Sequence, residues 1–176
     1  MLPVDVLIDE HKLILRAVAV VKRKIGDIKT GKTINPTQIT VMVDFFRTYA
    51  DRFHHGKEEG ILFSELTRKR LGEADKKVMN ELIMEHTIAR RNVTALEDAK
   101  ESFMSGNAEA LNTIFESTQA LADLYPKHIE KEDKRFFCPS MEYFSKQEQE
   151  DMYRKFQEFT RYFTDKRYSQ IISSLM

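Results

Sequence analysis

Four of the five histidines in this chain fall where a helix would turn them toward a protein core. His11, His86 and His128 continue runs of apolar residues spaced three and four apart, and His55 lies at the edge of such a run. An apolar stripe covers roughly a third of a helix, so random placement would put all four on stripes about one time in a hundred. Buried imidazoles need polar partners, and a shared metal supplies one to each. We therefore expect a metal site with one histidine from each of four helices.

Two glutamates are spaced to join these histidines. Glu59 lies four residues after His55, and Glu132 lies four residues after His128, so each pair shares one face of an α-helix. At about 100° per residue, Glu59 turns toward the core, whereas Glu58 points nearly opposite and is expected in solvent or behind the ligands. A carboxylate on an apolar stripe is costly without a cation. The predicted metal ligands are His11, His55, Glu59, His86, His128 and Glu132.

The ligand pattern occurs twice along the chain. His11 is followed 44 residues later by His55, and His86 is followed 42 residues later by His128. In both halves a glutamate precedes the first histidine, and a glutamate and a phenylalanine follow the second by four and eight residues. Two such hairpins, face to face, predict a pseudo-twofold site for two metal ions about 3.5–4 Å apart. Imidazole and carboxylate donors favour iron or manganese over structural zinc, which prefers thiolates.

Apolar periodicity predicts the long helices that must position these residues. The expected helices span about 3–29, 36–70, 74–104 and 108–136, with breaks at TGKTIN, Leu71-Gly72 and Ser105-Gly106. Asn35 is expected to cap the second helix, and Pro126 to kink or unwind the fourth.

A fifth helix is predicted to follow the bundle. Ser145 and Glu148 form a capping box at its start, and it runs to about Phe163. Because the connections are short, neighbouring helices should pack antiparallel. The predicted fold is all-α, an up-down antiparallel four-helix bundle with an additional C-terminal helix.

Composition limits the classes of function. The 176 residues are expected to form one domain, with the bundle at about 4–137 and the additional helical segment at about 140–176. Lys and Arg balance Asp and Glu, which argues against a nucleic-acid partner, and no apolar run approaches the roughly 20 residues that span a membrane. The single Cys138 and the acidic start MLPVDVLIDEH indicate a reducing compartment without a signal peptide, so we expect a cytoplasmic protein.

At the histidines the chain resembles the hemerythrin-like family, also called the HHE cation-binding domain. The matching pieces are DEH at 9–11, HHGKEEGILF at 54–63, MEH at 84–86 and HIEKED at 128–133, which together cover about residues 5–137. The resemblance implies two non-haem iron ions per chain, bridged by carboxylates and an oxo or hydroxo group, that bind oxygen or a related small ligand. Manganese or zinc could replace iron in a purified sample.

Some positions leave the ligand set open. The family that the chain resembles includes members whose last carboxylate ligand lies one residue later, which would make Asp133 the ligand here. The apolar stripe favours Glu132. The oxygen carriers have a fifth histidine one turn before the third-helix histidine, and Leu82 occupies that position here. His54 is expected to face away from the core, so one iron would lack a histidine. That ion would keep an open coordination position, or water, Glu58 or Glu85 would complete its coordination.

Three functions remain open from the sequence. The first is a binding protein that senses or stores oxygen, nitric oxide or iron, because the predicted site is enclosed and no organic-substrate pocket is evident. The second is a di-iron oxidoreductase acting on peroxide, oxygen or nitric oxide, since Leu82 stands in a ligand's place. The third is a metal-free helical interaction module. The oligomeric state is not indicated, and neither is whether the protein is an enzyme.

Overall fold

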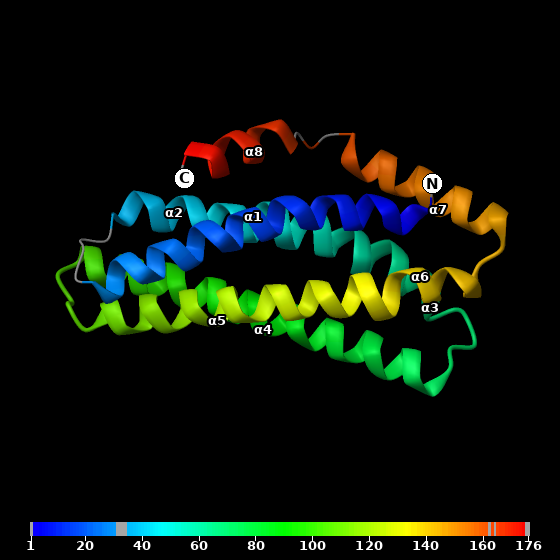
Figure 1. Cartoon of the computed structure of the whole chain (residues 1–176), viewed down its shortest axis with the longest axis horizontal. Coiled ribbons are helices and arrows are strands. Elements are labelled where there is room, and N and C mark those ends of the chain that lie inside the picture. The colour runs from blue at the N-terminus through cyan, green and yellow to red at the C-terminus, as the bar shows by residue number, and fades with distance from the viewer. Residues whose placement is uncertain (1, 31–34, 162, 164, 175–176) are drawn as a thin grey trace.

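Four long helical rods run antiparallel in the computed structural model, which describes residues 2–30, 35–161, 163 and 165–174 (Figure 1). The rods are α1 (Pro3–Lys29); α2 (Pro36–Asp44) continued by η1 (Phe45–His55), η2 (Glu58–Phe63) and α3 (Ser64–Leu66); α4 (Glu73–Met104); and α5 (Ala110–Lys131) continued by η3 (Glu132–Phe136) and α6 (Phe137–Ser140). No strand occurs in the described ranges, so the predicted all-α bundle is confirmed. Within those ranges, no helix combines the length and apolar character that a membrane crossing needs.

Local signals set the ends of the rods. The Asn35 side chain caps α2, as predicted, and Gly106 follows α4 in a left-handed conformation with φ 97°. The second rod ends at Leu66 rather than near residue 70, and Gly72 is the N-cap of α4 rather than the end of the helix before it. The predicted break TGKTIN falls mostly on residues 31–34, which lie outside the described residues.

The second rod and the end of the fourth contain π-helical turns, which the sequence does not predict. In η1, η2 and η3 the backbone bonds from residue i to i+5, so each turn holds more residues and successive side chains are separated by a smaller angle. Angular positions calculated for an α-helix therefore do not hold after Asp44. The fourth rod is helical on both sides of Pro126 and becomes π-helical only at Glu132.

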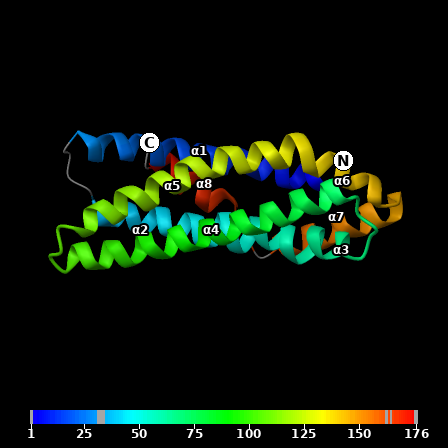
Figure 2. The ribbon, with the colours of Figure 1, turned by 90° about the horizontal axis from the view of Figure 1, so that it is seen from below.

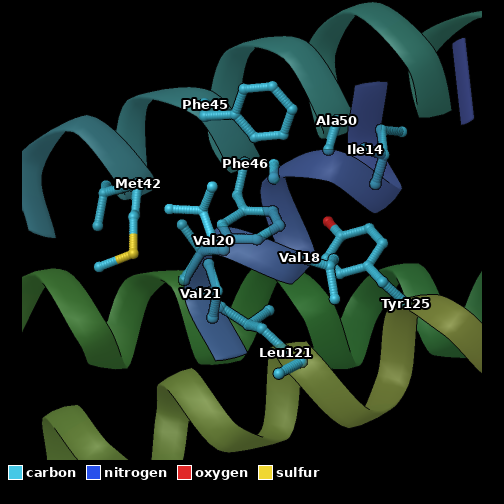
Figure 3. Packing of buried hydrophobic residues seen from close by; sticks show 14 of the residues in the cluster. Ile14, Val18, Val20, Val21, Met42, Phe45, Phe46, Ala50, Leu121 and Tyr125 are labelled. Carbon is cyan, nitrogen blue, oxygen red and sulfur yellow. The ribbon is translucent and has the colours of Figure 1, made fainter. Parts of the chain in front are cut away.

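Two apolar clusters fill the bundle and leave a polar layer between them. In the larger cluster, Ile14 and Val21 of α1 pack with Phe46 of η1 and Leu121 of α5 (Figure 3). The smaller cluster lies at the other end of each rod and includes Leu7. On the first three rods the buried histidines and glutamates lie between the two clusters, and on the fourth rod His128 and Glu132 lie on either side of Ile129 of the larger cluster. Because apolar side chains close both ends of this layer, polar groups inside it are kept from water.

Two further helices lie along one long side of the bundle, as Figures 1 and 2 both show. They are α7 (Lys146–Thr160) and α8 (Asp165–Ser174), and the 3-10 turn η4 (Met141–Tyr143) leads into them. The predicted capping box is confirmed, because Ser145 Oγ accepts from the Glu148 backbone and the Glu148 carboxylate accepts from the Ser145 backbone. The helix ends at Thr160, before the predicted Phe163, and α8 was not predicted.

Replacing Phe156 of α7 with alanine tests whether the C-terminal helix belongs to the same folding unit. The Phe156 ring is fully buried in the smaller cluster, so Phe156→Ala should lower the free energy of unfolding by about 3–5 kcal/mol. Urea unfolding followed by circular dichroism should show one shifted transition. The exposed neighbour offers a control, Gln157→Ala, expected within about 0.5 kcal/mol of wild type. A separate early transition in the Phe156 variant would contradict a single unit.

Candidate metal centre

Five histidines and two glutamates from the four rods meet in the layer between the apolar clusters. They are His11 of α1, His54 and His55 of η1, Glu58 of η2, His86 of α4, His128 of α5 and Glu132 of η3. Each is at most 2% exposed. Their donor atoms form two groups, in each of which the atoms lie within 4.8 Å of one another: His55, Glu58, His86 and His128, and His11, His54, Glu58 and Glu132. Because the groups share a carboxylate, they could hold two neighbouring ions.

The two inner glutamates each reach both groups with their two oxygens. Glu58 lies between a histidine of the first hairpin and one of the second, and Glu132 does the same from the opposite side. A carboxylate in this position can bridge two metal ions. The Nε2–oxygen distances are 3.2 Å for His54–Glu58, 3.3 Å for His86–Glu58, 3.2 Å for His11–Glu132 and 3.2 Å for His128–Glu132.

The other nitrogen of each histidine contacts an outer carboxylate. When Nδ1 donates its proton outward, Nε2 presents its lone pair to the centre of the layer. Carboxylate–histidine pairs of this kind orient metal-binding imidazoles and make them better donors. The Nδ1–oxygen distances are 2.8 Å for His11–Asp133, 2.9 Å for His54–Glu10, 3.3 Å for His55–Asp51, 2.7 Å for His86–Glu59 and 2.8 Å for His128–Glu85.

Inward-facing nitrogens approach one another closely. The Nε2 atoms of His11 and His54 are 2.9 Å apart, and those of His86 and His128 are 3.1 Å apart. With both Nδ1 protons donated outward, each pair brings two lone pairs together. A cation between them, whether a proton or a metal ion, converts this repulsion into attraction.

Among the residues that the structure describes, five buried side-chain atoms of the layer form no hydrogen bond. They are Nε2 of His55 and both carboxylate oxygens of Glu58 and of Glu132. An unpaired buried polar atom costs about 1–3 kcal/mol, and a charged one costs more. All five belong to residue types that bind metal ions, and all lie in the two groups of donors. The residues present therefore fit a metal site.

Carboxylates outnumber the cations among the described residues that surround the layer. Two inner and five outer carboxylates contact the histidines. Among the described residues, three cations pair with the outer carboxylates: Lys57 with Glu10, Arg90 with Asp51 and Glu59, and Lys131 with Glu85. With neutral imidazoles this cluster carries a net charge of −4, which two divalent ions would neutralise.

The pKa values of two inner histidines respond to this negative charge, whereas burial and the neighbouring histidines hold the pKa of His55 well below its usual range. Burial alone would lower the pKa of His54, but the charge of Glu58 and the hydrogen bond with Glu10 outweigh it and raise the pKa to about 10. Burial opposes the charge of Glu132 at His128 in the same way, and the pKa of His128 is also raised to about 10. The metal-free layer thus attracts protons, and metal ions would compete with protons for the same donors.

A family model for the hemerythrin HHE cation-binding domain matches residues 2–139, which include the entire cluster of histidines and glutamates. The chain belongs to this family. The segment from residue 140 onward, with α7 and α8, lies beyond the match. Comparison with curated proteins and with solved structures gives no significant match.

This HHE domain orients two pairs of adjacent residues differently from the sequence prediction. Five of the six predicted ligands lie in the cluster, but Glu59 has a 32% exposed side chain and contacts Nδ1 of His86 and the Arg90 guanidinium. Glu58, expected to face away, is fully buried, and His54 turns inward together with His55. The π-helical turns of η1 and η2 are the physical reason, because they place consecutive residues closer in angle than an α-helix does.

A repeat in the sequence contained the signal for His54 and Glu58. HHGKEE at 54–59 and HIEKED at 128–133 share the pattern His-x2-Lys-Glu-acid, which pairs His54 with His128. The structure follows this register, because Glu59 and Asp133 each contact the histidine of the opposite hairpin. The alignment of the two halves in the sequence analysis, which paired His55 with His128, was therefore shifted by one residue. Asp133 and Glu85, left open as ligands, contact Nδ1 atoms instead.

The fifth histidine of this HHE domain comes from the second rod. Leu82 is fully buried in the smaller apolar cluster. The sequence comparison had placed it where the oxygen carriers have their fifth histidine. His55 occupies the additional place, with Ile129 as its counterpart in the repeat. The expectation that His54 faces away from the core is wrong, and the absence of a histidine at one ion was inferred from it.

Alanine variants of the two adjacent glutamates test which one binds metal. Glu58→Ala removes a carboxylate common to both groups and should abolish binding of both ions. Glu59→Ala removes only a partner of His86, so it should keep both ions with affinity about 10–100-fold weaker. Metal content after anaerobic loading and desalting, measured by mass spectrometry, distinguishes them. Retention by the Glu58 variant with loss in the Glu59 variant would contradict the arrangement.

Proposed function

We propose that this chain is a non-haem di-iron protein that binds oxygen, nitric oxide or a related small ligand. The five unpartnered nitrogen and oxygen atoms at the centre of the polar layer carry this proposal. The two iron ions would supply redox-active positions at which such a ligand binds. Imidazole with carboxylate favours iron or manganese over structural zinc. The proposed ligands are His11, His54, His55, His86, His128, Glu58 and Glu132.

The two halves of the layer offer unequal numbers of donors, which supports ligand binding at one of them. One half has three imidazoles, from His55, His86 and His128, and the other has two, from His11 and His54. Both inner glutamates have an oxygen near each half. An ion held by the half with two histidines would have one imidazole ligand fewer, which would leave a coordination position for an outside ligand.

Enclosure supports a ligand of very few atoms. The donor side chains are almost fully buried, and Phe137 stacks on His11 with ring centroids 5.7 Å apart. A cavity of about 220 Å³ lies on the other flank, beside His55, and Tyr125 forms part of its wall. A space of this size admits diatomic molecules and peroxide.

The same cavity favours a second candidate, a di-iron oxidoreductase that acts on peroxide, oxygen or nitric oxide. Its lining includes Arg47, Asp51, Arg52 and Arg90 beside apolar residues, so water and peroxide can enter it. In this function the ligand would be consumed with electrons from an external donor rather than released unchanged.

Exposure of the iron-loaded protein to oxygen tests the proposed function. Protein loaded anaerobically with two equivalents of Fe(II) should develop a visible absorption band with oxygen and lose it when oxygen is removed, through several cycles. Optical spectroscopy in a sealed cell gives the measurement. Sustained consumption of oxygen or peroxide with a reductant would instead support the oxidoreductase. Absence of both would contradict the proposal.

Metal loading should also stabilise the fold. Because ions relieve the charge and the unpaired atoms of the layer only in the folded state, free Fe(II) at about 100 times its dissociation constant should add roughly 2.7 kcal/mol of stability for each independently bound ion. Anaerobic thermal unfolding should show a higher Tm, reversed by a chelator. An unchanged Tm across an Fe(II) titration would contradict a metal site built into the core.

A further inference from the structure

Lys57 is a lysine enclosed in the protein next to the candidate metal centre. Its side chain is 0% exposed, its ammonium forms an ion pair with Oε1 of Glu10, and Nζ lies 3.5 Å from the centroid of the Phe53 ring. Removing an ammonium group from water costs several kcal/mol, and good pairing must offset this cost. A buried ammonium therefore needs a specific partner, and the partner of Lys57 is Glu10.

Glu10 connects Lys57 to a histidine of the centre. Its other oxygen, Oε2, lies 2.9 Å from Nδ1 of His54, so Lys57 and His54 contact opposite oxygens of one carboxylate. Glu10 is itself buried. With both oxygens engaged, this carboxylate has one orientation, and the His54 ring bound to it is oriented in turn.

The second hairpin contains the same arrangement. Lys131 contacts Oε1 of Glu85 at 2.6 Å, and Oε2 of Glu85 lies 2.8 Å from Nδ1 of His128. In both hairpins the lysine follows its histidine by three residues and precedes the inner glutamate by one. Lys131 differs in being 21% exposed, so water can replace it, whereas water cannot readily reach Lys57.

The C-terminal segment helps to keep Lys57 dry. The Phe53 ring under its ammonium stacks on Phe163, with centroids 4.0 Å apart and planes 9° from parallel. Phe159 of α7 approaches the same turn so closely that a Cβ at Gly56 would lie 3.0 Å from its ring. Phe159 and Phe163 lie beyond the part of the chain that the family model matches.

We propose that Lys57 is a positioning residue that, through Glu10, holds His54 in the orientation needed to bind the ion shared with His11. The inference rests on the proposed di-iron centre. It adds that binding of the two ions depends to different degrees on the lysines behind their histidines. The ion beside His11 and His54 depends on Lys57, and the other ion depends less on Lys131.

Anaerobic Fe(II) titrations with a competing chelator test this inference. Wild type should bind two ions. Lys57→Met keeps the side-chain length without the charge, and it should bind one ion as wild type does and the other about tenfold or more weakly. Lys131→Met is the matched control and should show a smaller loss. Unchanged affinities in Lys57→Met would overturn the inference alone, whereas a wild type that binds no ion would contradict the di-iron centre and the inference with it.

Two further measurements separate positioning from a general effect on stability. Glu10→Gln combined with Lys57→Met should weaken binding little more than either change alone, because the residues act as one unit. Nitrogen NMR of zinc-loaded Lys57→Met should show changed imidazole nitrogen chemical shifts for His54. The shifts of His128 should be those of wild type. If Lys57→Met does not fold, Lys57→Gln takes its place with the same expected pattern. Additive losses, or equal changes at both histidines, would overturn the inference.

Discussion

Two carboxylates without hydrogen-bond partners lie buried in the middle of an apolar bundle, and the rest of the structure depends on this constraint. Glu58 and Glu132 are fully buried, and among the described residues their oxygens form no hydrogen bond and face imidazole nitrogens instead. Such groups are stable only next to positive charge. Four rods therefore converge on a layer that requires cations. The apolar clusters on either side keep water away and strengthen every electrostatic interaction within the layer.

Charge alternates outward from the centre in successive shells. Inner carboxylates face the imidazoles, outer carboxylates contact the Nδ1 atoms, and Lys57, Arg90 and Lys131 contact those carboxylates. Each shell pairs with the one inside it, so the orientation of an inner histidine depends on residues outside the two donor groups. The two hairpins share one pattern, yet they differ in hydration at the lysines and in the additional His55. A repeated sequence has thus produced a centre with two unequal halves.

The helical rods and most of the cluster could be predicted from the sequence, because apolar periodicity and capping residues act locally. The choice between adjacent residues could not. Counting at 100° per residue placed Glu59 inward, whereas the π-helical turns bring Glu58 inward and leave Glu59 to contact His86. The same count selected Glu132 over Asp133 in accord with the structure, because α5 is α-helical up to Lys131. Tertiary packing, which a single-sequence count does not contain, determines where the π-helical turns occur.

Diffraction at the iron absorption edge from crystals of iron-loaded protein tests the central claim most directly. Two anomalous peaks per chain are expected, about 3.5–4 Å apart. One should lie between His11 and His54 and the other among His55, His86 and His128, with the two inner carboxylates spanning both. A single peak, no peak in the polar layer, or iron bound through Glu59 in place of Glu58 would contradict it.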